Sequence, residues 1–263
     1  MNPLFKGIAA NDAKDLVNFI IMTLHSELNT KKVSNQYDDY GMIDQTNKEL
    51  VYDSFIKDYI NSNSSIISEL FYAHNYSISE CTNCHKKTYN YQIYFFMIFY
   101  LEEVRKYKIL MDNNINNELN IYDCFDYDGR LNFLTGESSM YCNYCGENCD
   151  FTMETKLAGC PKILILLLNR GQGNKFDVKI NFEKIINLNK YIENSNTDCN
   201  YELIGVITHI GESSMSGHFI AYCKDPLSNN WHKYNDAFVD EVKNFEEEVI
   251  NYAMPYLLFY QKM

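Results

Sequence analysis

The stretch Gly217-His218-Phe219-Ile220-Ala221-Tyr222-Cys223, followed by Trp231-His232-Lys233-Tyr234-Asn235-Asp236, is the part of this chain that decides its fold. Both runs alternate bulky apolar residues with other residues, which is the period of a half-buried strand. Residues 224–230 between them have the composition of a turn, so the two runs predict an antiparallel hairpin. With the turn centred near Leu227, His218 pairs with Asp236 and lies beside Asn235.

An imidazole held by a side-chain amide or carboxylate is the base-and-orienter part of a nucleophilic triad. The third group fixes the tautomer of the ring and steadies the imidazolium. On these residues alone, however, the stronger interpretation is an ordinary surface hairpin with a histidine and an asparagine at its opposite ends.

The same residues resemble a known motif. Gly217-His218-Phe219-x-Ala221-Tyr222 and Trp231-x-Lys233-Tyr234-Asn235-Asp236 are similar to the histidine box of the ubiquitin-specific proteases, which are papain-like ubiquitin carboxyl-terminal hydrolases. The resemblance implies that His218 is the general base, that Asn235 orients it and that Asp236 is a neighbouring polar support. His209 and His232 match no catalytic position of that box, and we expect structural or surface roles for both.

A helix is predicted from Ala13 to about Asn29, with Asn11 as its cap, because apolar residues recur there at spacings of three and four. Residues 5–17 resemble a second box of the family, whose acidic residues bind the basic tail of ubiquitin. The resemblance implies that Asp12 and Asp15 contact the substrate. A structural role is equally open, since carboxylates in the first turn of a helix are stabilised by its dipole.

Two Cys-x-x-Cys pairs, Cys81-Cys84 and Cys142-Cys145, predict a structural Zn²⁺ site with four thiolate ligands. The segment between the pairs is long, so we expect the two knuckles at the tips of separate hairpins. We expect His85 to be a surface residue. Three other cysteines are predicted to be small buried apolar residues: Cys124, Cys149 and Cys160.

The resemblance covers residues 5–260 and implies an α+β fold of the papain-like ubiquitin-specific protease type. We expect a helical part over residues 1–64, zinc-bearing antiparallel fingers over 65–150 and a palm sheet with the histidine box over 151–263. The pattern along the chain predicts a short helix near 49–60 and the start of another at 121–125. It predicts one long strand over 88–101 and a strand over 162–170 that is buried on both faces at the centre of a sheet. Further strands are predicted over 175–182, 201–209 and 253–261, and a flexible loop over 211–217.

Composition excludes several classes of protein. A net charge of −12 opposes binding to a nucleic-acid backbone and suits a partner with a basic tail. The longest apolar runs are much shorter than the ~20 residues needed to cross a bilayer, so we expect no membrane partner. Nine cysteines, an odd number with four in knuckle spacing, favour a reducing compartment, and with no secretory signal visible at the start we expect the cytosol or the nucleus.

The family's first box, in which the nucleophilic cysteine opens a helix, has no match in this sequence, and no cysteine precedes Cys81. Three explanations are open: the chain is the C-terminal portion of a longer peptidase, it is a short relative that binds ubiquitin without cutting, or another cysteine such as Cys223 serves. The last has poor geometry, because Cys223 and His218 are an odd number of residues apart and face opposite sides of a strand. The implied function is a cysteine-type deubiquitinase acting on ubiquitin or ubiquitinated proteins, and the alternative is an inactive, zinc-containing ubiquitin-binding or scaffold protein.

Overall fold

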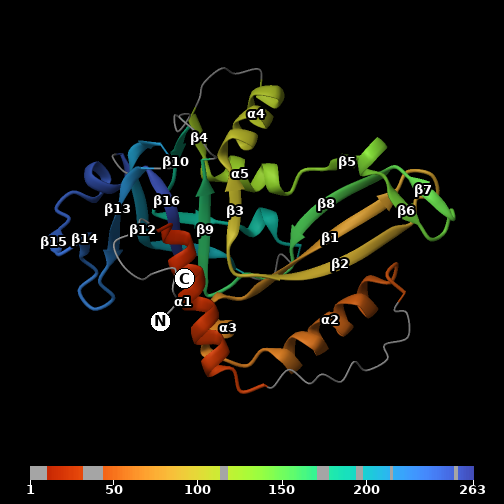
Figure 1. The fold of residues 1–263 in the computed structure, drawn as a ribbon, viewed down its shortest axis with the longest axis horizontal. Helices are drawn as coiled ribbons and strands as arrows, with labels where there is room; N and C mark the ends of the chain where they lie inside the picture. The colour runs from red at the N-terminus through yellow and green to blue at the C-terminus, as the bar shows by residue number, and fades with distance from the viewer. Residues whose placement is uncertain are drawn as a thin grey trace.

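A computed structural model describes residues 11–31, 44–112, 118–170, 178–193, 198–213, 216–251 and 254–263. Two mainly antiparallel sheets dominate it, one projecting away from the other (Figure 1). The helices are α1 (Ala13–Leu28), α2 (Lys48–Ser62), α3 (Ile66–Phe71), α4 (Leu101–Asp112) and α5 (Ile121–Asp128), with single turns η2 (Gly136–Ser138), η3 (Asn189–Tyr191) and η4 (Glu246–Ile250). This mixture of helices and mainly antiparallel sheet confirms the α+β fold class.

The larger sheet, here called the palm sheet, has the strand order β15-β14-β13-β12-β16-β9-β3, and β11 pairs with β12 beside this path. Only the pair of β3 with β9 is parallel. Its strands are β3 (Met97–Tyr100), β9 (Ile163–Asn169), β11 (Ile185–Asn187), β12 (Asn200–Ser213), β13 (Ser216–Lys224), β14 (Trp231–Asn235), β15 (Phe238–Glu241) and β16 (Pro255–Lys262).

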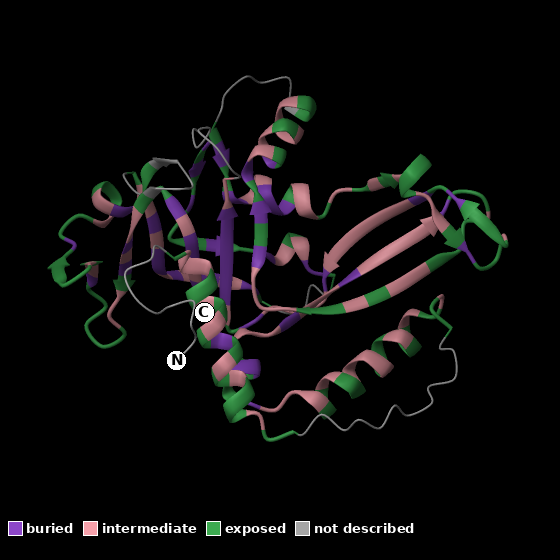
Figure 2. Ribbon diagram, in the orientation of Figure 1, coloured by how far each residue is buried: buried purple, intermediate pink, exposed green. Residues whose placement is uncertain are grey.

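Strand β9 is buried on both faces, as its continuous apolar run predicts (Figure 2). Ile165 and Leu167 pack with α1 and α3, whereas Leu164, Leu166 and Leu168 pack with α4 and α5 on the other face. The strand is next to last in the palm sheet, so the prediction that it lies at the centre is wrong. Helices on both faces explain the burial, because any interior strand between two helical layers meets apolar side chains on each side.

The smaller sheet, here called the finger sheet, has the order β2-β1-β8-β5 and projects from the palm sheet with α2 alongside it (Figure 1). Tyr52 and Phe55 of α2 lie with their rings 5.2 and 5.5 Å from the ring of Tyr91 on β2. The strands are β1 (Ala73–Cys81), β2 (Lys87–Tyr94), β5 (Asn132–Leu134) and β8 (Phe151–Leu157); small pairs are made by β4 (Glu118–Asn120) with β10 (Lys179–Asn181) and by β6 (Met140–Cys142) with β7 (Glu147–Cys149). The finger sheet thus includes β8, beyond residue 150, and β3 belongs to the palm sheet.

The predicted single strand over 88–101 is wrong, because the chain leaves the finger sheet after Tyr94 and enters the palm sheet at Met97. Phe95 and Phe96 make this crossing with their rings in edge contact, 4.9 Å apart, inside the cluster that packs α1 and α3 on the palm sheet. Strand β3 then ends at Tyr100, and α4 begins at the next residue; its Leu101 and Val104 are fully buried. Aromatic side chains are favourable in both sheets, so the alternation of residues in the sequence did not show that the strand ends between Tyr94 and Met97.

Most of the other predicted elements are present, and one is corrected. Helices α2 and α5 and the strands β12 and β16 occupy the predicted segments. The described residues of the predicted loop over 211–217 belong to strands: β12 runs to Ser213, which pairs with Ser216 after an irregularity that starts at Ile210, and residues 214–215 lie outside the described residues. The expected strand over 175–182 falls partly outside the described residues, and its described part holds the short β10. No helix in the described ranges is both long and apolar enough to cross a bilayer.

Candidate functional site

His218 and Asn235 are in direct contact at one end of the palm sheet. Nε2 of His218 lies 2.5 Å from Oδ1 of Asn235, and the side chain of His218 is 44% exposed. An amide oxygen only accepts hydrogen bonds, so this contact places the ring proton on Nε2 and leaves Nδ1 as an acceptor. The half-exposed ring can therefore take up a proton from a group that approaches from solvent.

The register of the hairpin differs by one residue from the prediction. The ladder pairs Lys224 with Trp231 and Ala221 with Tyr234, so the turn is centred between Leu227 and Ser228. Continued past its end, this register puts Asn235 opposite Ile220, on the same face of the sheet as His218. A one-residue slip exchanges the two faces, and it is the reason why Asn235, and not Asp236, lies in contact with the ring.

Asp236 is a minor partner of His218. Its carboxylate oxygen lies 3.8 Å from Nε2 of His218, and its side chain is 79% exposed. Asp236 has a φ of +50° in the two-residue loop between β14 and β15, a conformation that aspartate tolerates better than most residues. Water screens so exposed a charge, so Asn235 makes the stronger of the two contacts.

Asp12 is the N-cap of α1, so the predicted cap at Asn11 is wrong by one residue. Its carboxylate accepts a hydrogen bond of 2.8 Å from the backbone N–H of Lys14. The hydroxyl of Tyr256 on β16 donates to the two oxygens of Asp12, at 2.7 and 2.8 Å. Burial and this carboxylate raise the pKa of Tyr256, which keeps the phenol protonated as a donor. Asp15, in the first turn, is 56% exposed and lies 3.5 Å from Nζ of Lys14.

Changing Asp12 separates its two predicted roles. We expect Asp12→Ala to lower the free energy of unfolding by about 2 kcal/mol, since it removes both a helix cap and an acceptor for Tyr256. Asp12→Asn keeps the cap and an acceptor oxygen, so we expect its stability to stay within about 1 kcal/mol of the unaltered chain. If Asp12 also binds the basic tail of ubiquitin, Asp12→Asn weakens ubiquitin binding about tenfold, as measured by calorimetry. Asp15→Asn is the exposed control; unchanged ubiquitin affinity in Asp12→Asn would leave Asp12 with its structural role alone.

The two Cys-x-x-Cys pairs meet at the tip of the finger sheet, each in its own hairpin as predicted. Cys81 is the last residue of β1 and Cys84 lies in the turn that leads to β2; Cys142 is the last residue of β6 and Cys145 lies in the turn that leads to β7. The two turns share one geometry. The residue after the second cysteine, His85 or Gly146, has a positive φ of 57° or 76° and donates its N–H to the carbonyl of the first cysteine, at 2.9 or 2.8 Å.

The four sulfurs fit a tetrahedral metal ion. All four lie within 4.8 Å of one another, with Cys84 and Cys142 3.6 Å apart and Cys81 and Cys145 3.9 Å apart. Zinc–sulfur bonds of about 2.3 Å in a tetrahedron require sulfur separations of about 3.8 Å. Burial opposes ionisation of Cys81, but hydrogen bonds from the backbone of Cys84 and Asn83 lower its pKa to about 6. The four cysteines together can hold a metal ion.

The predictions for the neighbouring residues hold with one refinement. Cys124 and Cys149 are buried and Cys160 is half-buried. Cys149 lies beside the four-cysteine cluster, where its sulfur accepts a hydrogen bond from the side chain of Asn83 at 3.5 Å. His85 is a surface residue whose side chain is 75% exposed.

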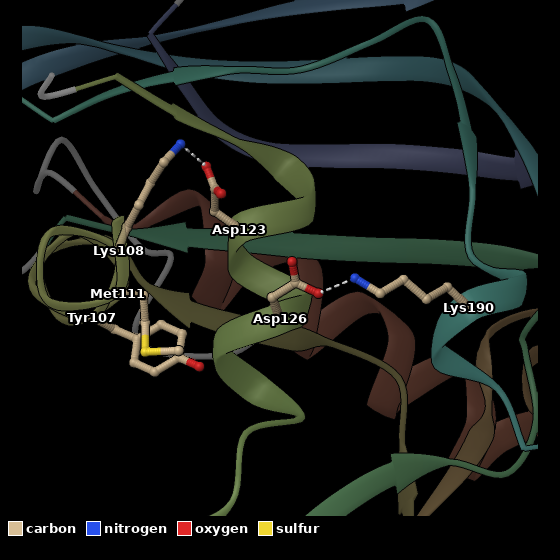
Figure 3. A pocket seen from close by; sticks show the side chains of 6 residues that line it. All are labelled: Tyr107, Lys108, Met111, Asp123, Asp126 and Lys190. Atoms are coloured by element: carbon tan, nitrogen blue, oxygen red, sulfur yellow. Dashed lines mark hydrogen bonds and ion pairs between the residues drawn. The ribbon is translucent and has the colours of Figure 1, made fainter. Parts of the chain in front are cut away.

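A hollow of about 360 Å³ lies elsewhere, between α4, α5 and η3 (Figure 3). Lys108 pairs with Asp123 and Lys190 with Asp126, each at 2.7 Å, while Tyr107 and Met111 complete the lining. Its acids and bases are thus matched with one another. It includes none of the predicted site residues.

Comparison with known proteins adds the family. A family model described as ubiquitin carboxyl-terminal hydrolase matches residues 1–260. This chain belongs to the ubiquitin carboxyl-terminal hydrolase family. The match covers the histidine hairpin, the finger sheet and the segment that contains α1.

Two of the similar members of this family match almost the whole chain, and a third matches half of it. Ubiquitin carboxyl-terminal hydrolase Usp2 of Drosophila melanogaster is 25% identical over 98% of this chain, and ubiquitin carboxyl-terminal hydrolase 2 of Gallus gallus is 25% identical over the same share. The chain spans 26% of the length of the first relative and 70% of the second. Ubiquitin carboxyl-terminal hydrolase 48 of Danio rerio is 29% identical over 51% of this chain, which corresponds to 13% of that relative.

Solved structures show the same fold. The SAGA Ubp8/Sgf11/Sus1/Sgf73 DUB module bound to ubiquitin aldehyde matches 97% of this chain at a TM-score of 0.66 and 21% identity. A structure of the yeast SAGA DUB module matches 96% at a TM-score of 0.68 and 23% identity. In each comparison the chain covers 50% of the other chain. The ubiquitin-specific protease fold implied by the sequence is therefore confirmed.

For His209 the sequence predicts a structural or surface role but no position relative to the histidine box. His209 on β12 pairs with Phe219, and their rings lie 4.9 Å apart. It therefore lies beside the strand that carries His218, and is neither remote nor fully exposed. The signal was available, because an antiparallel partner strand that ends eight positions before the histidine box must run alongside it.

Proposed function

We propose that this chain carries the general base and the ubiquitin-binding surface of a cysteine-type deubiquitinase, which hydrolyses the bond between the C-terminal glycine of ubiquitin and a lysine amine. The contact of 2.5 Å between Nε2 of His218 and Oδ1 of Asn235 carries this proposal. It is the pairing of a base with its orienter that thiol hydrolysis requires. Membership of the family and structural neighbours that include a DUB module bound to ubiquitin aldehyde support the choice of substrate.

In the proposed reaction Nδ1 of His218 accepts the proton of a cysteine thiol, and the thiolate attacks the carbonyl carbon of the terminal glycine. The tetrahedral intermediate collapses as the carbon–nitrogen bond breaks, and the imidazolium gives its proton to the leaving lysine amine. The resulting thioester is then attacked by a water that transfers a proton to His218; the carbon–sulfur bond breaks and the imidazolium returns that proton to the departing thiolate. The products are a free carboxylate on ubiquitin and the regenerated thiol. Asn235 accepts the Nε2–H throughout, which fixes the tautomer of the neutral ring and holds the imidazolium in the same orientation.

The remaining parts of the proposal concern the metal, the partner and the compartment. Zn²⁺ is the ion we assign to Cys81, Cys84, Cys142 and Cys145, because four thiolates at these separations suit it, and its role is structural. The partner is ubiquitin or a ubiquitinated protein, with Asp12 and Asp15 as proposed contacts to its basic tail. Nine free cysteines are consistent with the cytosol or the nucleus.

The alternative, a ubiquitin-binding protein that does not cut, is favoured by the positions of the nine cysteines. Four form the finger cluster, Cys149 is buried beside them, and three are buried or half-buried elsewhere: Cys124, Cys160 and Cys199. Cys223 is five residues from His218 on β13, roughly 16 Å along the strand and on its other face. The thiol of Cys223 is exposed, and desolvation by its surroundings raises its pKa; burial raises the pKa of Cys160 to about 12, whereas a nucleophile needs a thiolate at neutral pH.

A ubiquitin with a thiol-reactive electrophile at its C-terminus tests both functions. If the 263-residue chain supplies its own nucleophile, we expect a covalent adduct, and peptide mass spectrometry identifies the cysteine. If the nucleophile lies outside these residues, the chain forms no adduct but binds unmodified ubiquitin, and the protein as expressed in its source forms the adduct. Cys223→Ser is the matched control and is expected to change nothing. Binding by both forms without an adduct in either would establish the alternative, and absence of binding would contradict both functions.

A further inference from the structure

We propose that His209 is a positioning residue that fixes the main chain on both sides of His218. This inference rests on the proposed role of His218 as the base. It adds a second histidine that contacts no reacting atom and acts through its packing. Three features carry it: the incomplete backbone pairing at His218, the space above Gly217 and the ring contact with Phe219.

The backbone at His218 is only partly held by the palm sheet. On one side, the ladder with β14 begins only at Ala221. On the other side, the ladder with β12 is regular up to the pair of Ile210 with His218 and then shifts register. The base therefore stands at the last regular pair of one ladder and beyond the end of the other. Strand ends of this kind open more easily than strand centres, so a fixed imidazole needs further support.

The ring of His209 occupies the space that a side chain at residue 217 would fill. A Cβ added to Gly217 would lie 2.2 Å from Nε2 of His209, 2.4 Å from Cε1 of the same ring and 2.7 Å from the carbonyl oxygen of Ile210. Real Cβ atoms do not approach other atoms so closely. Glycine at this position thus allows the imidazole to lie against the main chain immediately before the base.

The other neighbour of the base is held by the same imidazole. Phe219 pairs with His209 across the ladder, with their ring centroids 4.9 Å apart. The ring of Phe219 lies 5.5 Å from that of Tyr256, whose hydroxyl binds the Asp12 cap of α1. A continuous line of contacts therefore runs from α1 to both residues that flank His218. Aromatic contacts at these separations restrain ring positions beyond simple burial.

The surroundings of His209 suit packing in its neutral form. Burial lowers the pKa of His209; the carboxylate of Asp12 opposes this shift, and the guanidinium of Arg170 adds to it. Arg170 is itself fixed, because it donates hydrogen bonds to the carbonyl oxygens of Val178 and Pro255. A neutral ring can lie against a backbone without a charge to be solvated.

The test is the exchange with water of the His218 Nε2–H proton, followed by NMR with labelled imidazoles and assigned by its loss in His218→Ala. We expect His209→Ala to raise the exchange rate about tenfold or more, because the strand end opens more often. His209→Phe keeps a planar ring against Gly217, so its rate is expected to stay within about twofold of the unaltered chain. His232→Ala, which changes a histidine on the adjacent strand β14, is the matched control and is expected to have no effect.

A folded His209→Ala protein with unchanged exchange would overturn the inference. If that variant does not fold, His209→Leu decides in its place: it fills a similar volume without a planar ring, and it too must raise the exchange rate. Asn235→Ala separates this inference from the proposed function. If Asn235→Ala leaves the proton as well protected as before, the His218–Asn235 pair is not formed in solution and the proposed function fails. If it removes the protection while His209→Ala does not, only the role of His209 fails.

Discussion

Cys142→Ala is expected to abolish zinc binding and to unfold the tip of the finger sheet. Few apolar side chains support the tip: the buried cluster around the four sulfurs contains Phe151, with Leu134 and Met140 only partly buried. Structural zinc sites contribute about 10–16 kcal/mol of binding free energy in small zinc domains, which far exceeds what three side chains supply by burial. We expect one zinc ion per unaltered chain by mass spectrometry of metals, none in the variant, and rapid proteolysis between residues 81 and 150.

Cys149→Ser is the matched control for this experiment. Cys149 is 4% exposed and lies in the same cluster, yet it is not one of the four sulfurs that can share an ion. We expect it to retain one zinc per chain and to lose at most about 2 kcal/mol of stability from the polar substitution. Because the palm sheet has its own core on two faces, chelation should melt the fingers first and leave the far-ultraviolet spectrum of the palm largely intact. A chain purified without zinc whose melting ignores chelators would contradict the assignment.

Two parts of the molecule were predictable from sequence because their chemistry is local. A Cys-x-x-Cys knuckle brings its own geometry wherever it occurs, so two of them predict a four-sulfur site without knowledge of the sheet that carries them. The doubly buried run of β9 likewise depends only on the chain's own apolar residues, of which five in succession, Leu164 to Leu168, are buried. The order of the strands, however, depends on pairing between distant segments, which local sequence does not determine. In the structure β9 lies next to the edge strand β3.

The hairpin shows where local reasoning ends. The turn composition located the turn correctly, but it could not decide whether the centre lies at Leu227 or between Leu227 and Ser228. Asn229 adopts the positive φ of the turn, +60°, and several neighbouring residues could have adopted it instead. A shift of the turn centre by half a residue changes the pairing of the two strands by one residue. This change decides whether Asn235 or Asp236 lies on the same face of the sheet as His218. The resemblance to the histidine box favoured Asn235, and the contact lies there. The proposed role of His209 could not be predicted without the fold, because only the structure shows that the ring of His209 occupies the space beside Gly217.

His218→Ala is expected to lower kcat/KM about 10³-fold or more in any form of the protein that hydrolyses ubiquitin amides. Loss of a general base lowers the rate about 10²–10⁴-fold. When several residues act as a unit, removing one of them costs more than its additive share of their joint effect. Asn235→Ala keeps the base but frees its tautomer, so we expect a smaller loss of about 10²-fold in kcat/KM. Asp236→Asn is expected to change the rate less than about threefold, since its carboxylate is 79% exposed and 3.8 Å away.

The order of these three losses is the informative result, because each follows from one distance. Asn235 at 2.5 Å must matter more than Asp236 at 3.8 Å if orientation of the ring limits the rate. An equal or larger loss in Asp236→Asn would show that the carboxylate orients the base during catalysis and that the hairpin rearranges when ubiquitin binds. Full activity in His218→Ala, with His232→Ala as the control, would place the base elsewhere. Ubiquitin affinity measured alongside should stay unchanged in all of these variants, because the pair acts on the proton and not on the bound tail.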